Sequence, residues 1–327
     1  LPHRRVQSTD PGDRVAGTKT QSRISLIDIA RGVALIAMTI YHFTWDLEFF
    51  GWAPPATTLQ TGWVLFARGI ASSFLFLVGV SLFLGHNKGI RWQDFWKRFL
   101  LVAGCAALIS LATWFAVPGG FIFFGILHAI ALFSVLALPF LFVPWWLVVL
   151  AAAVFWFGGT WLSNDLFNTP SLWWTGLSPV NPISNDFVPL FPWFSAPLLG
   201  IAMAKLAATM GLFERMKGIA QASLADKSFG LIGRHSLIYY MVHQPLMMGL
   251  LWAFTTIAGP PDRTPAFLHN CEKSCSASNE AQFCEKFCAC TSDGLKRADL
   301  FTPFHEGKVD LSTDPKAQNI IEQCSAQ

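Results

Sequence analysis

Residues 24–46 read ISLIDIARGVALIAMTIYHFTWD, an apolar run that can cross most of a bilayer. The run nevertheless carries Asp28 and Arg31 near one end, and His42 and Asp46 near the other. Ionisable side chains are costly inside a membrane helix unless they are paired or hydrated, so they are candidates for function. Arg31 and His42 are separated by about three helical turns, which places them on nearly the same face of the predicted helix.

The composition of the whole chain indicates a polytopic membrane protein. Hydrophobic residues make up 53% of the chain and charged residues only 13%, whereas soluble domains contain about 25% charged residues. We therefore expect an all-α transmembrane bundle with no internal repeat. Seven spans are predicted, near residues 24–44, 62–85, 96–116, 121–142, 145–163, 188–209 and 231–258.

The loops between these spans alternate in charge. Lys and Arg concentrate in 1–23, 86–98 and 205–230, while 45–61 and 163–187 contain neither. The positive-inside rule then places the N-terminus in the cytoplasm and the C-terminus outside the cell (inner) membrane, with membrane lipids as partners. Residues 1–23 are polar and lack the apolar centre of a signal peptide, so we expect a disordered basic cytoplasmic tail.

Six of the seven cysteines lie in the polar C-terminal segment 259–327, which follows the membrane body 24–258. An even set of cysteines in a short segment is typical of disulfides in an oxidising compartment, in agreement with the loop charges. Two pairs are each one helical turn apart, as in a disulfide-stapled helical hairpin. The simplest pairing joins Cys271 to Cys288, Cys275 to Cys284, and Cys290 to Cys324.

Two alternatives to this pairing stay open. Six cysteines allow fifteen connectivities, among which sequence alone cannot choose. A zinc site that includes His269 or His305 is also possible, but the predicted compartment favours disulfides, and we expect no bound metal.

Further polar residues lie in other predicted spans. Taken singly, His128 or His243 would be expected only to hydrogen-bond a neighbouring helix, and Asp28 and Arg31 to form a structural ion pair. Taken together with His42, they suggest one polar cavity. Asp46 is four residues after His42, so it can orient one ring nitrogen and leave the other as a base. The candidate catalytic residues are Arg31, His42, Asp46, His128 and His243.

Other classes of function find no support in the sequence. It contains no phosphate-binding loop, no dinucleotide-binding glycine motif and no G-x-S-x-G motif. The basic residues are explained by membrane orientation, so no nucleic-acid partner is expected.

Over residues 24–258 the sequence resembles the heparan-α-glucosaminide N-acetyltransferase catalytic-domain family. The motifs that carry this resemblance include Ile27-Asp28-Ile-Ala-Arg31-Gly32, Phe124-Gly125-Ile-Leu-His128, Gly233-Arg234-His235-Ser236 and His243-Gln244-Pro245. The Arg-x10-His spacing is similar to that of bacterial membrane acyltransferases that O-acetylate polysaccharides, and the catalytic role of His42 is taken from that group. The resemblance implies a helix bundle that moves acetyl from cytoplasmic acetyl-CoA to an extracytoplasmic glycan or lipid-linked sugar, at an amine or a hydroxyl.

Within this interpretation, Arg31, Arg91 and Arg98 attract the phosphates of acetyl-CoA, although positive-inside charge alone would also explain the loop residues. His42 acts as general base on the acceptor or accepts the acetyl group itself. The main alternative is a membrane carrier for a small anion or a lipid-linked sugar, which internal repeats would support. A membrane anchor for the Cys-rich domain is a third possibility, but an anchor needs no buried polar residues.

Overall fold

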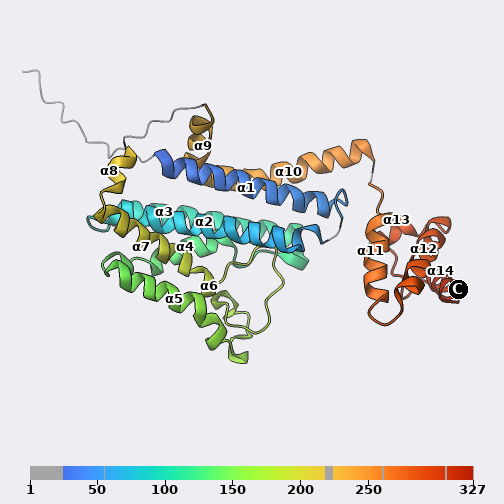
Figure 1. Cartoon of the computed structure of the whole chain (residues 1–327). Helices are drawn as coiled ribbons and strands as arrows, with labels where there is room; N and C mark the ends of the chain where they lie inside the picture. Colours follow the sequence, from blue (N-terminus) through green and yellow to red (C-terminus); the bar gives the residue numbers. More distant parts are fainter. Residues whose placement is uncertain (1–24, 55, 218–223, 260, 306–307, 327) are drawn as a thin grey trace, which may run out of the picture.

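The computed structural model describes residues 25–54, 56–217, 224–259, 261–305 and 308–326. The predicted disordered tail 1–23 lies outside these residues. The described part is built from helices and turns, with a single isolated β-bridge between Phe124 and Phe187 and no strand. The predicted all-α class and the small Cys-rich C-terminal region are confirmed (Figure 1).

Six helical segments in the described residues are long and apolar enough to cross a membrane. They are α1 (Ser25–Phe49), α2 (Thr61–His86), α3 (Trp92–Ala116), α5 (Trp145–Leu162), α6 with α7 (Leu190–Trp193 and Ser195–Thr209), and α10 (Ser236–Ala258). Large apolar side chains on their outer faces are exposed, for example Phe115, Trp161 and Ile257. Such a surface is suited to lipid and not to water, so this is an integral membrane protein.

The prediction of a full-length fourth span over 121–142 is wrong, because the helix in this segment is short. Its helix, α4, covers only Ile126–Leu136, which at 1.5 Å per residue is about half the thickness of the hydrocarbon core. On the N-terminal side, Phe124 is held in the β-bridge to Phe187, so the helix cannot start before Gly125. On the C-terminal side, Pro139 opens a 3-10 turn, η3 (Pro139–Leu141).

The predicted seventh span, 231–258, is divided between two helices. α9 (Leu224–Arg234) ends where His235 leaves the helical conformation, and α10 begins at Ser236. α9 crosses α1 at very short range, as Figure 1 shows near the start of α1. A Cβ atom on Gly233 would overlap the carbonyl oxygen of Asp28, so only glycine permits this approach.

The other helices form the lower layer of the bundle in Figure 1. α2 packs closely against α7, and α7 against α5, around a core that includes Leu75, Phe133, Phe194 and Leu198. A short helix, α8 (Leu212–Lys217), follows α7. The remaining elements are short 3-10 turns: η1 (Thr57–Leu59), η2 (Pro118–Gly120), η4 (Asp165–Phe167) and η5 (Trp173–Thr175).

The C-terminal region contains four short helices: α11 (Thr264–Cys275), α12 (Ala281–Arg297), α13 (Phe301–His305) and α14 (Pro315–Ser325). Phe267, Leu295 and Ala317 form its small core. The structure confirms the predicted pairing, because disulfides join Cys271 to Cys288, Cys275 to Cys284, and Cys290 to Cys324.

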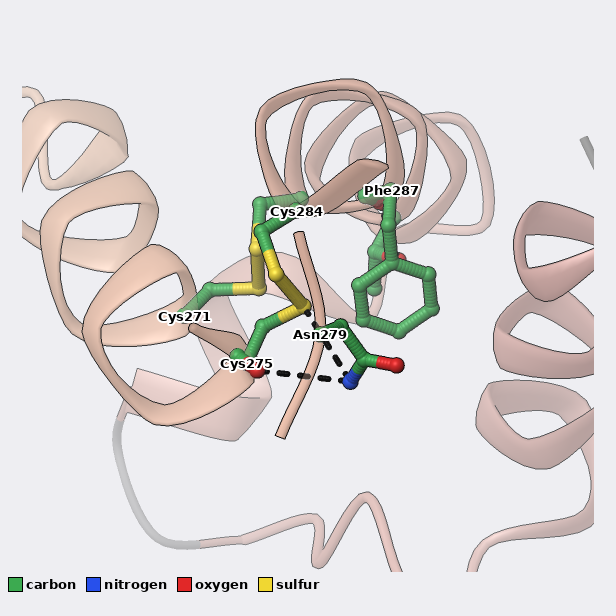
Figure 2. The surroundings of a disulfide bond; sticks show 7 residues. Cys271, Cys275, Asn279, Cys284 and Phe287 are labelled. Atoms are coloured by element: carbon green, nitrogen blue, oxygen red, sulfur yellow. Dashed lines mark hydrogen bonds between the residues drawn. A yellow bond between two sulfur atoms is a disulfide. The ribbon is translucent and has the colours of Figure 1, made fainter. Parts of the chain in front are cut away.

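Figure 2 shows the first two of these bonds side by side between α11 and α12, where the Asn279 side chain donates to the carbonyl oxygen of Cys275. His269 and His305 do not join a metal-binding group, and no cluster of three or more His, Cys, Asp or Glu side chains placed to hold a metal occurs among the described residues.

Candidate functional site

Two of the predicted histidines meet between α1 and α10. The ring centroids of His42 and His243 are 5.3 Å apart, with the rings inclined at 62°. Tyr239 stacks on His243 at 5.9 Å, and Tyr240 contacts the same ring at 5.7 Å. Residues about 200 positions apart in sequence therefore form one polar and aromatic cluster. We call its two histidines, His42 and His243, the histidine pair.

The surroundings of His243 fix its tautomer. Its Nδ1 lies 2.7 Å from the carbonyl oxygen of Tyr240. A carbonyl oxygen only accepts hydrogen bonds, so Nδ1 carries the proton and Nε2 keeps its lone pair. Nε2 is buried and has no hydrogen-bond partner among the described residues. His243 thus presents an unprotonated nitrogen, as a general base or nucleophile requires.

Asp46 does not have the predicted role of orienting the His42 ring. In the described residues it forms no hydrogen bond with His42; instead, its Oδ1 accepts a hydrogen bond of 2.5 Å from Nε2 of Gln244. Asp46 is completely buried, and its Oδ2 has no hydrogen-bond partner in the part of the chain that the structure describes. Because Gln244 directly follows His243 on α10, Asp46 ties the His42 end of α1 to α10 and does not orient the His42 ring.

His128 has a structural position at the start of α4. Its Nδ1 accepts a hydrogen bond from the backbone N–H of Gly125 at 3.3 Å, and its Nε2 lies 3.2 Å from Oγ of Ser110. Nδ1 is therefore engaged in capping α4, and Nε2 is engaged with α3. No ring contact or hydrogen bond within the described segments joins His128 to the histidine pair, so the structure does not bring it into this cluster.

Asp186, in the loop before α6, completes the start of α4. Its Oδ2 accepts a hydrogen bond of 2.8 Å from the backbone N–H of Ile126. Burial raises the pKa of Asp186 to about 6, although this hydrogen bond favours the charged form. Nothing in the local sequence pattern of Asp186 indicates that it returns to a helix terminus sixty residues earlier, so it was not among the predicted site residues.

Arg31 lies at the other end of α1. Its guanidinium forms an ion pair of 3.0 Å with Asp28 and a hydrogen bond with Ser81 of α2. The predicted ion pair is present, and it leaves Arg31 on the wall of a cavity of about 520 Å³. Arg98 of α3, Arg234 and His235 line the same cavity, which therefore has a basic end.

The rest of this cavity, which we call the basic cavity, is mainly apolar. Its walls include Leu35, Phe74 and Ile126, and it extends to Tyr240. The ring of Tyr240 contacts that of His243, so one side chain separates the basic cavity from the histidine pair. Arg98 has no hydrogen bond or ion pair to any other described residue, so its charge is available to a ligand.

A second cavity of about 130 Å³ adjoins the first and shares Arg98 with it. Its polar lining residues are Ser81, His86, Arg91, Asp94, Arg98 and Ser134. The three predicted donor-binding residues, Arg31, Arg91 and Arg98, are thus distributed over two neighbouring cavities. The sequence reading did not include His86, because it lies at the end of a span beside basic loop residues.

Comparison with known proteins identifies the family of this bundle. The family model described as heparan-alpha-glucosaminide N-acetyltransferase, catalytic, matches residues 23–245. The chain belongs to this family. No curated protein and no solved structure matches the chain. The match includes Arg31, both cavities and the histidine pair, and it ends just after Gln244, whereas the disulfide-linked helices α11–α14 lie outside it.

Proposed function

We propose that this member of a membrane acetyltransferase family takes acetyl from acetyl-CoA on the cytoplasmic side and transfers it to an amine or hydroxyl of a sugar on the opposite side. The observation that carries the proposal is the basic cavity, which has a group of arginines at one end and extends to Tyr240, whose ring contacts His243. A carrier would also need a cavity, but it would have no use for a histidine with a fixed tautomer and an unpaired Nε2.

The basic cavity suits the donor in charge and in shape. Arg31, Arg98 and Arg234 supply guanidinium groups at one end, and guanidinium groups bind phosphate oxygens in a bidentate manner. One carboxylate, Asp28, lies among them and is already paired with Arg31. The apolar wall beyond this end fits an extended, largely uncharged chain such as the pantetheine arm, with its thioester directed at Tyr240 and His243.

The histidine pair supplies the proton transfers that the reaction needs. The acceptor oxygen or nitrogen attacks the acetyl carbon, the carbon–sulfur bond breaks, and the acceptor's proton must reach the departing thiolate. His42, which also contacts Tyr41 towards the outer end of α1, takes the proton from the acceptor. Nε2 of His243, which carries no proton in the resting protein, receives this proton from His42 and delivers it to sulfur. The neighbouring rings allow the proton to pass between them through one water molecule or directly.

This function is tested with the purified full chain in detergent, by measuring CoA binding and acetyl-CoA turnover with sugar acceptors. His42→Gln and His243→Gln should each lower turnover by about 10²–10⁴-fold while CoA still binds. Arg98→Gln should weaken CoA binding. His269→Gln, an exposed histidine on α11, is the matched control and should change neither quantity.

Two outcomes would contradict the proposal. Turnover near the wild-type rate in both histidine variants would remove the histidine pair from the mechanism. A wild-type protein that neither binds CoA nor turns over acetyl-CoA, but moves a labelled anion or lipid-linked sugar in liposomes, would support the carrier.

A further inference from the structure

The smaller cavity contains a buried imidazole nitrogen that the transfer reaction does not use. Nε2 of His86 is shielded from solvent and has no hydrogen-bond partner in the described part of the chain, while Nδ1 lies 3.1 Å from the carbonyl oxygen of Leu82. As at His243, the carbonyl partner places the proton on Nδ1. A buried nitrogen without a partner costs free energy, so it indicates a ligand that supplies the missing hydrogen bond.

The residues around His86 indicate what kind of ligand this is. Arg91 and Arg98 line the same small cavity, which at about 130 Å³ has room for a phosphate-sized anion and not for a nucleoside. Arg98 also lines the basic cavity, so an anion in the small cavity lies next to the predicted position of the donor. Two guanidinium groups and an imidazole are a typical set of ligands for a phosphate.

We infer that the cavity formed by His86, Arg91 and Arg98 binds the 3′-phosphate of the CoA nucleotide, an inference that rests on the proposed function. The 3′-phosphate is a monoester, whose second ionisation occurs near pH 6, as in phosphoserine. Near neutral pH a fraction of this group still carries one proton, and the site selects that form because its O–H can donate to Nε2 of His86. The remaining phosphate oxygens face Arg91 and Arg98, while the pyrophosphate lies by Arg31 and Arg234 in the basic cavity.

Substitution of Asp94 is expected to change phosphate binding in the opposite direction to substitution of His86 or Arg91. Its carboxylate lies 3.6 Å from the guanidinium of Arg91 and also lines the small cavity. In the absence of an anion it balances the charge of Arg91, but it repels a bound phosphate. Removing the carboxylate should therefore strengthen the binding of a phosphate at this position, whereas removing Arg91 or His86 should weaken it.

The experiment compares CoA with dephospho-CoA, which differs only in lacking the 3′-phosphate, by calorimetric titration of the purified full chain. The wild-type protein should bind CoA at least about tenfold more tightly, the effect of one charge-assisted contact. His86→Leu and Arg91→Gln should each reduce this preference by about tenfold, and Asp94→Asn should increase it. Lys88→Gln removes an exposed charge of the same loop that lines neither cavity, so its preference should equal that of the wild type.

Equal affinity of the wild type for CoA and dephospho-CoA would overturn the inference and leave the proposed function intact. The same holds if His86→Leu and Arg91→Gln weaken both ligands by the same factor. If the wild type binds neither ligand, the proposed function fails with it. Arg91 is exposed, so its variant tests the inference even if His86→Leu does not fold.

Discussion

The hydrogen bond between Gln244 and Asp46 should contribute measurably to the stability of the bundle. Asp46→Ala leaves the Gln244 amide without its acceptor, and Gln244→Ala leaves a completely buried carboxylate with no partner. Interhelical hydrogen bonds in membranes contribute about 0.6 kcal/mol on average and at most about 1.7. This bond is short, buried and made to a carboxylate, so we expect a coupling free energy of about 1.5 kcal/mol.

Asp46→Asn should behave differently from Asp46→Ala. The asparagine keeps an oxygen that accepts from Nε2 of Gln244, and its new amide can donate to Oε1 of Gln244, which is buried and has no partner among the described residues. We therefore expect the unfolding free energy of Asp46→Asn to lie within about 0.5 kcal/mol of the wild-type value. Its turnover should also be largely retained, because the structure does not use Asp46 to orient His42.

The assay is a double-mutant cycle of Asp46→Ala and Gln244→Ala, with the free energy of unfolding measured by denaturant titration in detergent micelles. The same two helices provide a matched control, since the hydroxyl groups of Thr39 and Tyr239 lie 2.7 Å apart in a neutral hydrogen bond. The cycle of Thr39→Ala and Tyr239→Phe should give only about 0.6 kcal/mol. A coupling below about 0.3 kcal/mol for Asp46 and Gln244, or an Asp46→Asn variant as inactive as His42→Gln, would refute the reasoning.

Three further predictions concern other parts of the chain. Gly233→Val should destabilise the protein by more than about 2 kcal/mol in thermal unfolding, because its Cβ would overlap the backbone of α1, whereas Gly249→Ala, with nothing within 4 Å, should be tolerated. Replacing Cys290 and Cys324 by serine opens a loop closed over 34 residues and should lower the free energy of unfolding by about 4 kcal/mol. If α11–α14 are extracytoplasmic, a membrane-impermeant reductant should reach this disulfide in intact cells. Burial raises the pKa of Asp186 from 3.8 to about 6. Protonation of this carboxyl therefore stabilises the fold fully below about pH 4, and this stabilisation is lost as the pH rises through 6. Asp186→Asn should flatten that part of the plot of unfolding free energy against pH.

Features that depend on local spacing were predicted well from the sequence. The cysteines at 271 and 275 are one helical turn apart, as are those at 284 and 288, and the structure confirms the simplest pairing of two such helices among the connectivities that the sequence left open. The long spans follow from hydropathy, because burying a polar backbone in lipid requires a helix. The ion pair of Asp28 and Arg31 likewise follows from their spacing within one helix turn.

Features that depend on how helices rotate against one another were not predicted. Asp46 has the right spacing to hold His42, but Gln244, 198 residues away, competes for it once α10 packs against α1. Hydropathy also cannot distinguish an apolar helix from an apolar extended segment, so the pairing of Phe124 with Phe187 shortened the fourth span without any local signal.

Under the proposed function, α1 explains how donor and acceptor chemistry is coordinated in such a small bundle. It carries Arg31 and His42 about 16 Å apart on one face, a distance set by the rise of the helix. α9 fixes one end of α1 through the close approach at Gly233, and the hydrogen bond from Gln244 to Asp46 fixes the other. The arginine-lined end of the basic cavity and the histidine pair are therefore held at a constant separation. A bound donor must span this separation in full before its thioester reaches His243, so a donor of the wrong length would bind without reacting.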